Sequence, residues 1–330
     1  PSEITVTKTD GSRYVYGIPT YNWKQREVSF SVGDAAPNAV PIARNADGSY
    51  DYSALASDIH TTGDKKGRGL DEFFNSSEQS AFAYSHLLTA SLSADYEART
   101  GDGPTADDLG AYVKFNYDRV DSSYKWRMPI GEQEARHATG YKSDPTDDKA
   151  SYTYGEKELW YLSSIETRDY VAFFYTSVRD DARGVSDEEG GVGNSASRKL
   201  DQIELYDLRD WKDSGVNAVP IKSVYFQYSY ELCPGIPNHV SPGPASGKLT
   251  LTKVWFQHYA SERGKLNPYT FEYDSDPSVL YNMRANDRWG TYSPALNHTD
   301  LLDNADFPYT VQDSALAASY ASLWNLNAIA

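Results

Sequence analysis

The sequence predicts a mostly β protein, built as an extended antiparallel sheet of hairpins, with a β-sandwich or a propeller as the alternatives. Two observations lead to this class. Tyrosine accounts for 27 of the 330 residues and methionine for only 2, and aromatic rings with a polar tip suit the half-buried face of a sheet. Runs in which apolar and polar residues alternate recur along the chain, and polar turn sequences separate them.

A hairpin is predicted over residues 3–18, because two alternating runs flank Asp10-Gly11, a dipeptide that suits a tight turn with positive φ. Residues 33–68 are rich in Gly, Ala, Asp and Pro and contain few large apolar side chains. That composition predicts a flexible surface loop. Further strands in this half are predicted at 27–32, 111–120 and 124–129.

The second half begins with a predicted strand–turn–strand over 151–181. Gly, Ser and acidic residues then fill 182–197, and Pro and Gly fill 234–247, so both ranges are predicted to be flexible loops. One short helix is predicted near the C-terminus, at 314–324, where apolar residues share one helical face. The remaining strands are predicted at 199–208 and 219–232 and within a hairpin over 248–273.

We expect residues 1–330 to form one segment of a larger β-rich repeat scaffold, with a division into 1–150 and 151–330 as the alternative. The chain opens directly on a strand pattern and stops on an apolar alternation, "SLWNLNAIA". Both features are typical of a segment of a longer polypeptide.

The bulk composition excludes several classes of partner. A net charge of -16 repels phosphate backbones, so we expect no nucleic-acid partner. The single cysteine, Cys233, rules out a disulfide within the chain, and a small buried apolar role suits it better than that of a nucleophile. No apolar run approaches the roughly 18 residues that a membrane helix needs, so we expect no membrane span.

The chain repeats a strand sequence in which tyrosine follows an aromatic residue two positions later. Alternation places both rings on one face of the sheet, so neighbouring copies would form aromatic ladders. Partner strands with an aliphatic-x-x-Ile/Val pattern accompany the copies, as in "KLDQIELY" and "KLTLTKVWF". The alternative is a set of ordinary aromatic strands without a common role. The copies are Phe115-Asn116-Tyr117, Phe173-Phe174-Tyr175, Phe226-Gln227-Tyr228 and Phe271-Glu272-Tyr273.

Several long stretches resemble very large surface or secreted proteins of Bacteroidota. The L-x-x-I and F-x-Y units are similar to those of RHS/YD-repeat proteins, whose repeats form a long sheet that spirals into a hollow shell. The closing "LWNLNAI" resembles the start of another such unit, although the chain lacks a regular Tyr-Asp repeat. The stretches are "DGSRYVYGIPTYN", "YSHLLTASLSADYEARTGDGPTADDLGAYVKFNY", "GEKELWYLSSIETRDYVAFFYTSVRDD", "KSVYFQYSYELCPGIPN", "GKLTLTKVWFQHY" and "NDRWGTY".

The resemblance implies a curled shell segment of an exported protein, located outside the cell or at its surface. In that family the shell encloses or carries a toxin or effector made elsewhere in the polypeptide. The implied role is structural, with no catalytic and no cofactor-binding residues. The implied partners are other segments of the same polypeptide, an enclosed effector or a surface glycan.

The acidic stretch 95–110 is the strongest candidate for a binding site. Asp102-Gly103 is similar to the turn of calcium loops, and calcium binds several oxygen ligands, many of them carboxylates. Ala98 and Arg99 depart from an EF-hand register, so an acidic solvated turn is the alternative interpretation. The candidate calcium ligands are Asp95, Glu97, Asp102, Asp107 and Asp108.

Two other functions fit the same composition. An acidic, aromatic-rich β protein suits a carbohydrate-binding module or a glycosidase, in which tryptophans stack on sugar rings and two carboxylates act in hydrolysis. A calcium-stiffened adhesin is compatible with the scaffold. The six histidines are scattered and lack the spacing of zinc ligands. The tryptophans considered for sugar stacking are Trp126, Trp160, Trp255 and Trp289.

Overall fold

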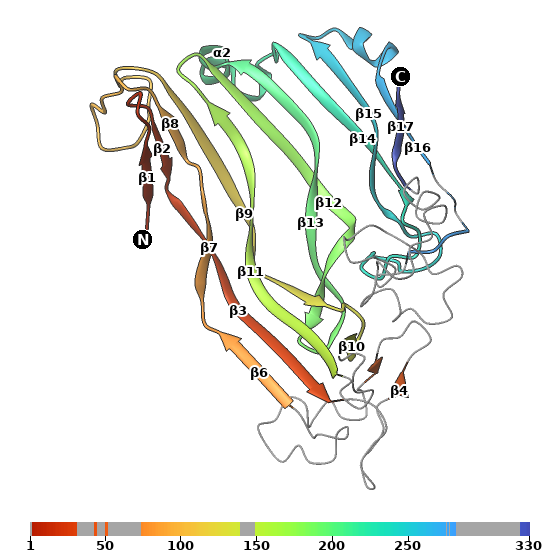
Figure 1. The fold of residues 1–330 in the computed structure, drawn as a ribbon. Coiled ribbons are helices and arrows are strands. Elements are labelled where there is room, and N and C mark those ends of the chain that lie inside the picture. Colours follow the sequence, from red (N-terminus) through yellow and green to blue (C-terminus); the bar gives the residue numbers. More distant parts are fainter. Residues whose placement is uncertain are drawn as a thin grey trace.

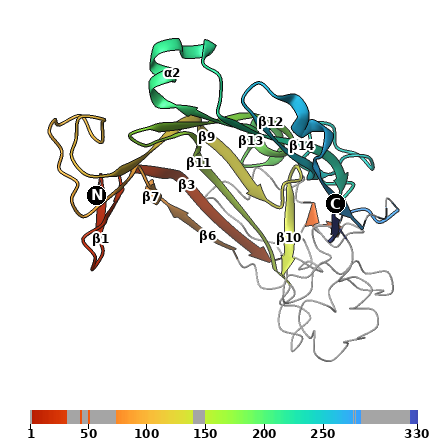
Figure 2. The same ribbon diagram turned by 90° about the horizontal axis from the view of Figure 1, so that it is seen from above.

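Strands dominate the fold and join into one large antiparallel sheet, which confirms the predicted class. The computed structural model describes residues 2–31, 43–44, 50–51, 74–138, 149–274, 276, 278–281 and 324–330. Figure 1 shows long strands that run nearly side by side, and Figure 2 shows that the sheet bends into an arch.

The strands differ widely in length, and the longest lie in the middle of the chain. The elements are β1 (Ile4–Thr7), β2 (Arg13–Tyr16), β3 (Ile18–Ser31), β4 (Ala43–Arg44), β5 (Tyr50–Asp51), β6 (Phe74–Gln79), β7 (Phe82–Leu87), β8 (Ala90–Leu92), β9 (Tyr112–Met128), β10 (Glu134–Ala138), β11 (Lys149–Glu166), β12 (Tyr170–Asp187), β13 (Gly190–Asp207), α2 (Leu208–Ser214), η2 (Gly215–Asn217), β14 (Lys222–Leu232), β15 (Lys248–His258), η3 (Glu262–Leu266), β16 (Tyr269–Tyr273) and β17 (Leu326–Ile329).

The main order of paired strands is β1–β2–β8–β9–β11–β12–β13–β14–β15–β16–β17. Strand β11 is the branch point, because β3 pairs with its first half and β12 with its end. Strand β3 also pairs with β6 and β7, and β10 joins β11 to β5 and β4. Since β11 begins at Lys149, one sheet continues across the alternative division at residue 150.

One pairing pattern recurs through this sheet. A strand with the sequence aromatic-x-Tyr or aromatic-x-Thr lies opposite a partner strand that contains a leucine. The aromatic residue faces the partner residue three positions after that leucine. The leucines are Leu88, which lies just before β8, and Leu162, Leu200, Leu251 and Leu326. The facing pairs are Tyr14 and Ser91, Phe115 and Ile165, Phe174 and Ile203, Phe226 and Val254, and Phe271 and Ile329.

A β-bulge follows the leucine in the last four of these pairs, because one partner residue there has no opposite residue. The side chain of a small polar residue can bond to the backbone where the ladder is interrupted. The hydroxyl of Thr252 donates to the Gln227 carbonyl at 3.0 Å, and that of Thr89 donates to the equivalent Val15 carbonyl at 3.1 Å. A bulge bends its strand, so bulges at equivalent positions repeat one bend across the sheet. The bulged residues are Ser163, Asp201, Thr252 and Asn327.

Successive copies of the pattern meet in one register. The partner residue that faces the aromatic residue also pairs with the next copy, along the other edge of its strand. There it meets the residue two positions before the next aromatic residue. For example, Ile203 faces Phe174 on one edge of β13 and Val224, two positions before Phe226, on the other. The part of the sheet formed by β2, β8, β9 and β11 to β17 is therefore an internal repeat of one two-stranded unit. The pairs at these seams are Ser91 with Val113, Ile165 with Ala172, Ile203 with Val224, and Val254 with Tyr269.

The tyrosine of the repeated sequence bonds each copy to the copy before it. Burial raises the pKa of Tyr117, Tyr228 and Tyr273, so their hydroxyls remain protonated donors. Thr176 takes the tyrosine's place in one copy and accepts a hydrogen bond from Arg198 instead. The hydroxyl-to-carbonyl distances are 3.0 Å from Tyr117 to Leu88, 2.7 Å from Tyr228 to Leu200, and 2.8 Å from Tyr273 to Leu251.

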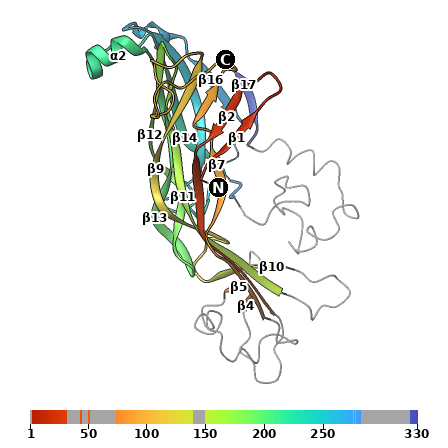
Figure 3. The same cartoon turned by 90° about the vertical axis from the view of Figure 1, so that its left-hand side faces the viewer.

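The two faces of the arch differ. Helix α2 projects from the outer face (Figure 3), where Trp211 packs against Phe173 and Tyr206 with ring centroids 4.5 and 4.9 Å away. Asp207 starts this helix, because its carboxylate accepts hydrogen bonds from two backbone N–H groups of the first turn. Residues alternate between faces along a strand, so Phe174 and the other aromatic and aliphatic residues of the repeat point to the inner face.

Several predicted elements are confirmed. The first hairpin turns at Asp10-Gly11, where Gly11 has a φ of 84°. The hairpin over 248–273 is β15 and β16. Residues 234–247 form a connection without strands, as predicted, but it is anchored and not flexible, since its backbone bonds to Asp180 and Arg183 of β12. The predicted helix at 314–324 lies outside the described residues apart from its last residue, and the predicted loop 33–68 lies outside them apart from β4 and β5.

Two predictions are wrong. Residues 182–197 form the ends of β12 and β13, not a loop, because Val185 is buried and the hairpin tip packs against other strands. In β12 the repeat is Phe174-Tyr175-Thr176, one residue later than predicted, because three successive aromatic residues leave the register open in sequence. The aromatic ladders predicted between copies are instead mixed rows of aromatic and aliphatic residues, such as Phe174, Ile203, Val224 and Phe256.

Replacing Tyr228 with Phe removes one hydroxyl and keeps the ring. We expect the free energy of unfolding to fall by about 1 kcal/mol, because the Leu200 carbonyl loses its partner. Urea unfolding of Tyr228→Phe and Tyr273→Phe measures this loss. The control is Tyr259→Phe, at a side chain that is 63% exposed. Equal changes in all three variants would show that the hydroxyls do not join the copies.

Candidate functional site

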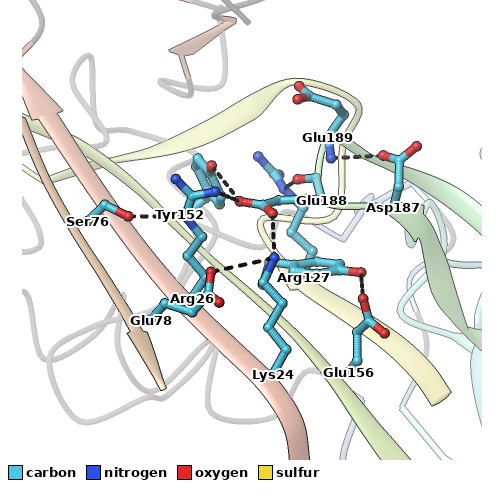
Figure 4. Close-up of polar contacts among 11 residues, drawn as sticks. Lys24, Arg26, Ser76, Glu78, Arg127, Tyr152, Glu156, Asp187, Glu188 and Glu189 are labelled. Carbon is cyan, nitrogen blue, oxygen red and sulfur yellow. Dashed lines mark hydrogen bonds and ion pairs between the residues drawn. The ribbon is translucent and has the colours of Figure 1, made fainter. Parts of the chain in front are cut away.

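The tip of the β12–β13 hairpin folds back over β3, β9 and β11 (Figure 4). We call the contacts of Glu188 with Lys24, Arg26, Arg127 and Tyr152 the polar latch. Lys24 and Arg26 come from β3, Arg127 from β9 and Tyr152 from β11. The latch therefore joins strands that are far apart in the sequence.

The Glu188 side chain accepts three hydrogen bonds. The Glu188 carboxylate lies 2.9 Å from Arg26 Nη1, 3.3 Å from Lys24 Nζ and 3.2 Å from the Tyr152 hydroxyl. Arg127 donates from Nε to the Glu188 carbonyl at 2.8 Å, and its guanidinium lies 4.5 Å from the centroid of the Tyr152 ring. The Glu188 and Arg26 side chains are only 18% and 16% exposed, so this pair is screened less than a surface ion pair.

Backbone contacts fix the same tip. The N–H of Gln133 donates to the Glu189 carbonyl at 2.6 Å, and that of Gly191 donates to the Ile130 carbonyl at 2.9 Å. Gly190 has a φ of 96°, and a Cβ there would lie 2.3 Å from the Gly131 carbonyl oxygen. Only glycine fits both the conformation and the space at this position.

A hydrophobic cluster lies beside the latch. At its margin, Tyr154 donates to Glu156 at 2.7 Å and Ser123 donates to the same carboxylate at 2.8 Å. Burial and the Glu156 carboxylate raise the pKa of Tyr154. Burial alone would raise the pKa of Glu156, but the two hydrogen bonds and the charges of Lys125 and Lys24 together lower that pKa overall. The cluster consists of Val28, Phe30, Ile130, Ala135, Ala150, Tyr152, Tyr154 and Val185.

The predicted calcium loop is an ordered turn in which Asp108 is the central residue. Asp108 is 2% exposed and accepts hydrogen bonds from the Tyr96 hydroxyl at 2.7 Å and from the N–H groups of Arg99 and Thr105 at 2.8 and 2.9 Å. These bonds, the Tyr96 hydroxyl first, lower the pKa of Asp108 to about 2. Burial and the Asp108 carboxylate raise the pKa of Tyr96 to about 12.

The other predicted ligands point to local partners. Asp95 accepts a hydrogen bond from Ser93, Asp102 from Thr100, and Asp107 from Thr105. The backbone of Glu97 pairs with Leu109. Among the described residues, no group of three or more His, Cys, Asp or Glu side chains is placed to hold a metal ion. A calcium role for the five residues stays a prediction.

A second buried carboxylate, Glu158, lies on β11 beside aromatic residues. It is 3% exposed, and it accepts hydrogen bonds from Arg119 Nη1 at 3.0 Å, Trp160 Nε1 at 3.0 Å and the Tyr21 N–H at 3.2 Å. Trp23 stacks on Tyr21 with ring centroids 5.1 Å apart and is 41% exposed. The described residues thus offer an exposed tryptophan beside one carboxylate whose oxygens already accept three donors.

Two of the remaining predicted tryptophans, Trp126 and Trp255, serve packing. Trp255 stacks on Tyr225 at 5.2 Å, and the Trp126 ring occupies the space that a Cβ at Gly155 would need. Trp289 lies outside the described residues. Cys233 is half-buried, and burial raises the pKa of its thiol, which lowers its nucleophilicity at neutral pH.

Sequence reasoning missed both Glu158 and Glu188. Glu188 belongs to "SDEEGG", whose composition is typical of a solvated acidic loop. The available signal was the Gly190-Gly191 pair, which suits a hairpin turn between strands. No such signal marks Glu158, because its partners come from three different strands.

Comparisons with protein families, with curated proteins and with solved structures find no match for this chain. In the part of the chain that the structure describes, no helix is long and apolar enough to cross a membrane.

Glu188→Gln tests the polar latch. We expect the free energy of unfolding to fall by about 2 kcal/mol, because Lys24 and Arg26 lose a shielded charge partner. The matched control is Glu78→Gln, since Glu78 also pairs with Lys24, at 3.6 Å, but is 55% exposed. The control should change stability by less than about 0.5 kcal/mol. Urea unfolding of both variants measures the difference, and equal effects would contradict the latch.

Asp108→Asn tests the acidic turn through its pH dependence. The pKa of Asp108 is lower in the folded chain than in the unfolded chain, so its hydrogen bonds stabilise the fold fully above about pH 4. That contribution is lost as the pH falls from about 4 to about 2. The melting temperature of the native chain should therefore drop more steeply over this interval than that of Asp108→Asn. Parallel curves would contradict this role.

Proposed function

We propose that this chain is a non-catalytic structural segment of a large exported protein of the RHS/YD type. Its repeated strands build a curved wall that encloses or presents something carried by the same polypeptide. The location outside the cell or at its surface, and the enclosed toxin or effector, belong to this proposal. The principal partners are other segments of the same polypeptide.

The repeated register carries the proposal. Four of the five copies place an aromatic residue opposite an aliphatic one. All four seams repeat one pairing. Units that contact only their neighbours can be added in series without a new core, as in other repeat proteins.

The inner face supports the same role. It carries the aromatic residue of every copy and, in four of the five copies, the aliphatic residue opposite it, so the concave side is apolar at these positions of the repeat. The latch holds the hairpin tip of β12–β13 against β3 and β11, which stiffens the wall at its branch point. A rigid concave apolar surface suits contact with enclosed polypeptide better than contact with a soluble sugar.

A carbohydrate-binding module or glycosidase is the second candidate. Exposed Trp23, stacked on Tyr21 next to the Glu158 cluster, is the observation that favours it. Hydrolysis by the usual mechanism needs two carboxylates across the scissile bond, and Glu158 already accepts three hydrogen bonds. Binding alone is therefore the stronger form of this candidate.

Duplication of one repeat tests the structural proposal. A second copy of residues 222–266, inserted after Leu266, brings its own aromatic-x-Tyr strand and its own bulge. We expect a soluble, cooperatively unfolding chain with a larger strand signal in circular dichroism, because the new seam has the register of the old ones. A chain that aggregates or fails to fold would contradict extension by repeats.

The matched control is the same duplication without the inserted copy of Thr252. Loss of one residue turns every following side chain of that strand to the other face, so this chain should fold poorly.

Titration calorimetry of the native chain with a panel of oligosaccharides tests the second candidate. A saturable heat that Trp23→Ala abolishes would favour sugar binding over the structural proposal.

A further inference from the structure

The outer edge of β17 differs from the edges of the other partner strands. Strand β17 pairs with β16 along one edge, and no strand among the described residues pairs with its other edge. Its sequence, Leu326-Asn327-Ala328-Ile329, has the leucine, the bulged polar residue and the isoleucine of the repeat. Leu326 and Ile329 are 47% and 58% exposed.

Every other partner strand of the repeat binds a second strand on that edge. In β8, β11, β13 and β15, the residue three positions after the leucine pairs with the residue two positions before the next aromatic residue. In three of these four seams the incoming tyrosine also donates to the leucine carbonyl. The equivalent groups of β17 are Ile329 and the carbonyl of Leu326.

We propose that the outer edge of β17 binds a further β-strand with the sequence aromatic-x-Tyr. The strand lies antiparallel to β17, with the residue two positions before its aromatic residue opposite Ile329. Its tyrosine hydroxyl donates to the Leu326 carbonyl. This inference extends the proposed function, because it names the chemistry of the segment that continues the wall.

The composition of this edge fits strand addition. Strands that end a sheet usually carry charges, proline or other features that prevent pairing, and residues 326–329 carry neither a charge nor proline. Main-chain hydrogen bonds then supply affinity, while side chains at alternate positions supply specificity.

The opposite end of the sheet lacks the same features. Strand β1 also exposes apolar residues, Ile4 and Val6, at 39% and 47%. It has no leucine followed by a polar residue, and it pairs Val6 with Tyr14, which is a different register from the four seams. We therefore assign the aromatic-x-Tyr partner to β17 and not to β1.

A peptide from this chain is the probe. Residues 220–231, "PIKSVYFQYSYE", contain the incoming strand of an internal seam. The fluorescein-labelled peptide is titrated against the full 330-residue chain and followed by fluorescence anisotropy. We expect saturable binding, and a peptide carrying Tyr228→Phe should bind about fivefold more weakly, because one hydrogen bond is lost.

Amide hydrogen exchange locates the bound peptide. Protection should increase at residues 326–330 and stay unchanged at residues 4–7. A peptide of scrambled sequence is the control for non-specific strand addition. Binding of the scrambled peptide with equal affinity, or saturation without protection of β17, would overturn the proposal.

Two further outcomes would also overturn the proposed partner of β17. Sedimentation of the chain alone that shows a dimer, with protection at both β1 and β17, would assign the edge to a second copy of the chain. If the peptide fails to bind while the duplicated chain folds, the repeat-built wall stands and the strand-binding edge does not.

Discussion

The bulge after each leucine is the constraint on which the rest of the sheet depends. One extra residue in the partner strand sets which side chains face each other on both sides of it, and it bends the strand. Ser163, Asp201, Thr252 and Asn327 take this place in four successive pairs. Because the seams share one register as well, the curvature is a property of the repeated unit and not of one local distortion.

The tyrosines explain how the described sheet is held in order. Their rings cover the sheet, and their hydroxyls bond to carbonyls of the preceding copy, as Tyr228 does with Leu200. The same group serves elsewhere as the donor to a carboxylate, in Tyr96 with Asp108 and in Tyr154 with Glu156. Tyrosine combines apolar area with a fixed polar tip, which is what a surface that is half core and half exposed requires.

The polar latch performs a different task at the branch of the sheet. Strands β3 and β12 both pair along the edge of β11 that lies opposite β9. The far ends of β12 and β13 therefore leave the plane of the sheet and fold over β3 and β9. The ion pairs of Glu188 with Lys24 and Arg26 hold the hairpin tip in place, and so does the burial of Val185 in the hydrophobic cluster. Repetition thus builds the long arch, while one specific set of contacts anchors the branch at β11.

The sequence by itself determined the β class, the first and last long hairpins and the repeated aromatic and leucine units, because alternation and turn residues are local properties of the chain. The resemblance of "LWNLNAI" to the start of another unit did not indicate that residues 326–329 pair with β16 as its partner strand. Only the tertiary structure decided the register of Phe174-Tyr175-Thr176, the strands in 182–197, and the roles of Glu158 and Glu188. Each of these depends on which distant strand lies alongside. An acidic residue in a glycine-rich stretch has the same sequence pattern whether its side chain is solvated or, like Glu188, accepts a hydrogen bond from Arg26.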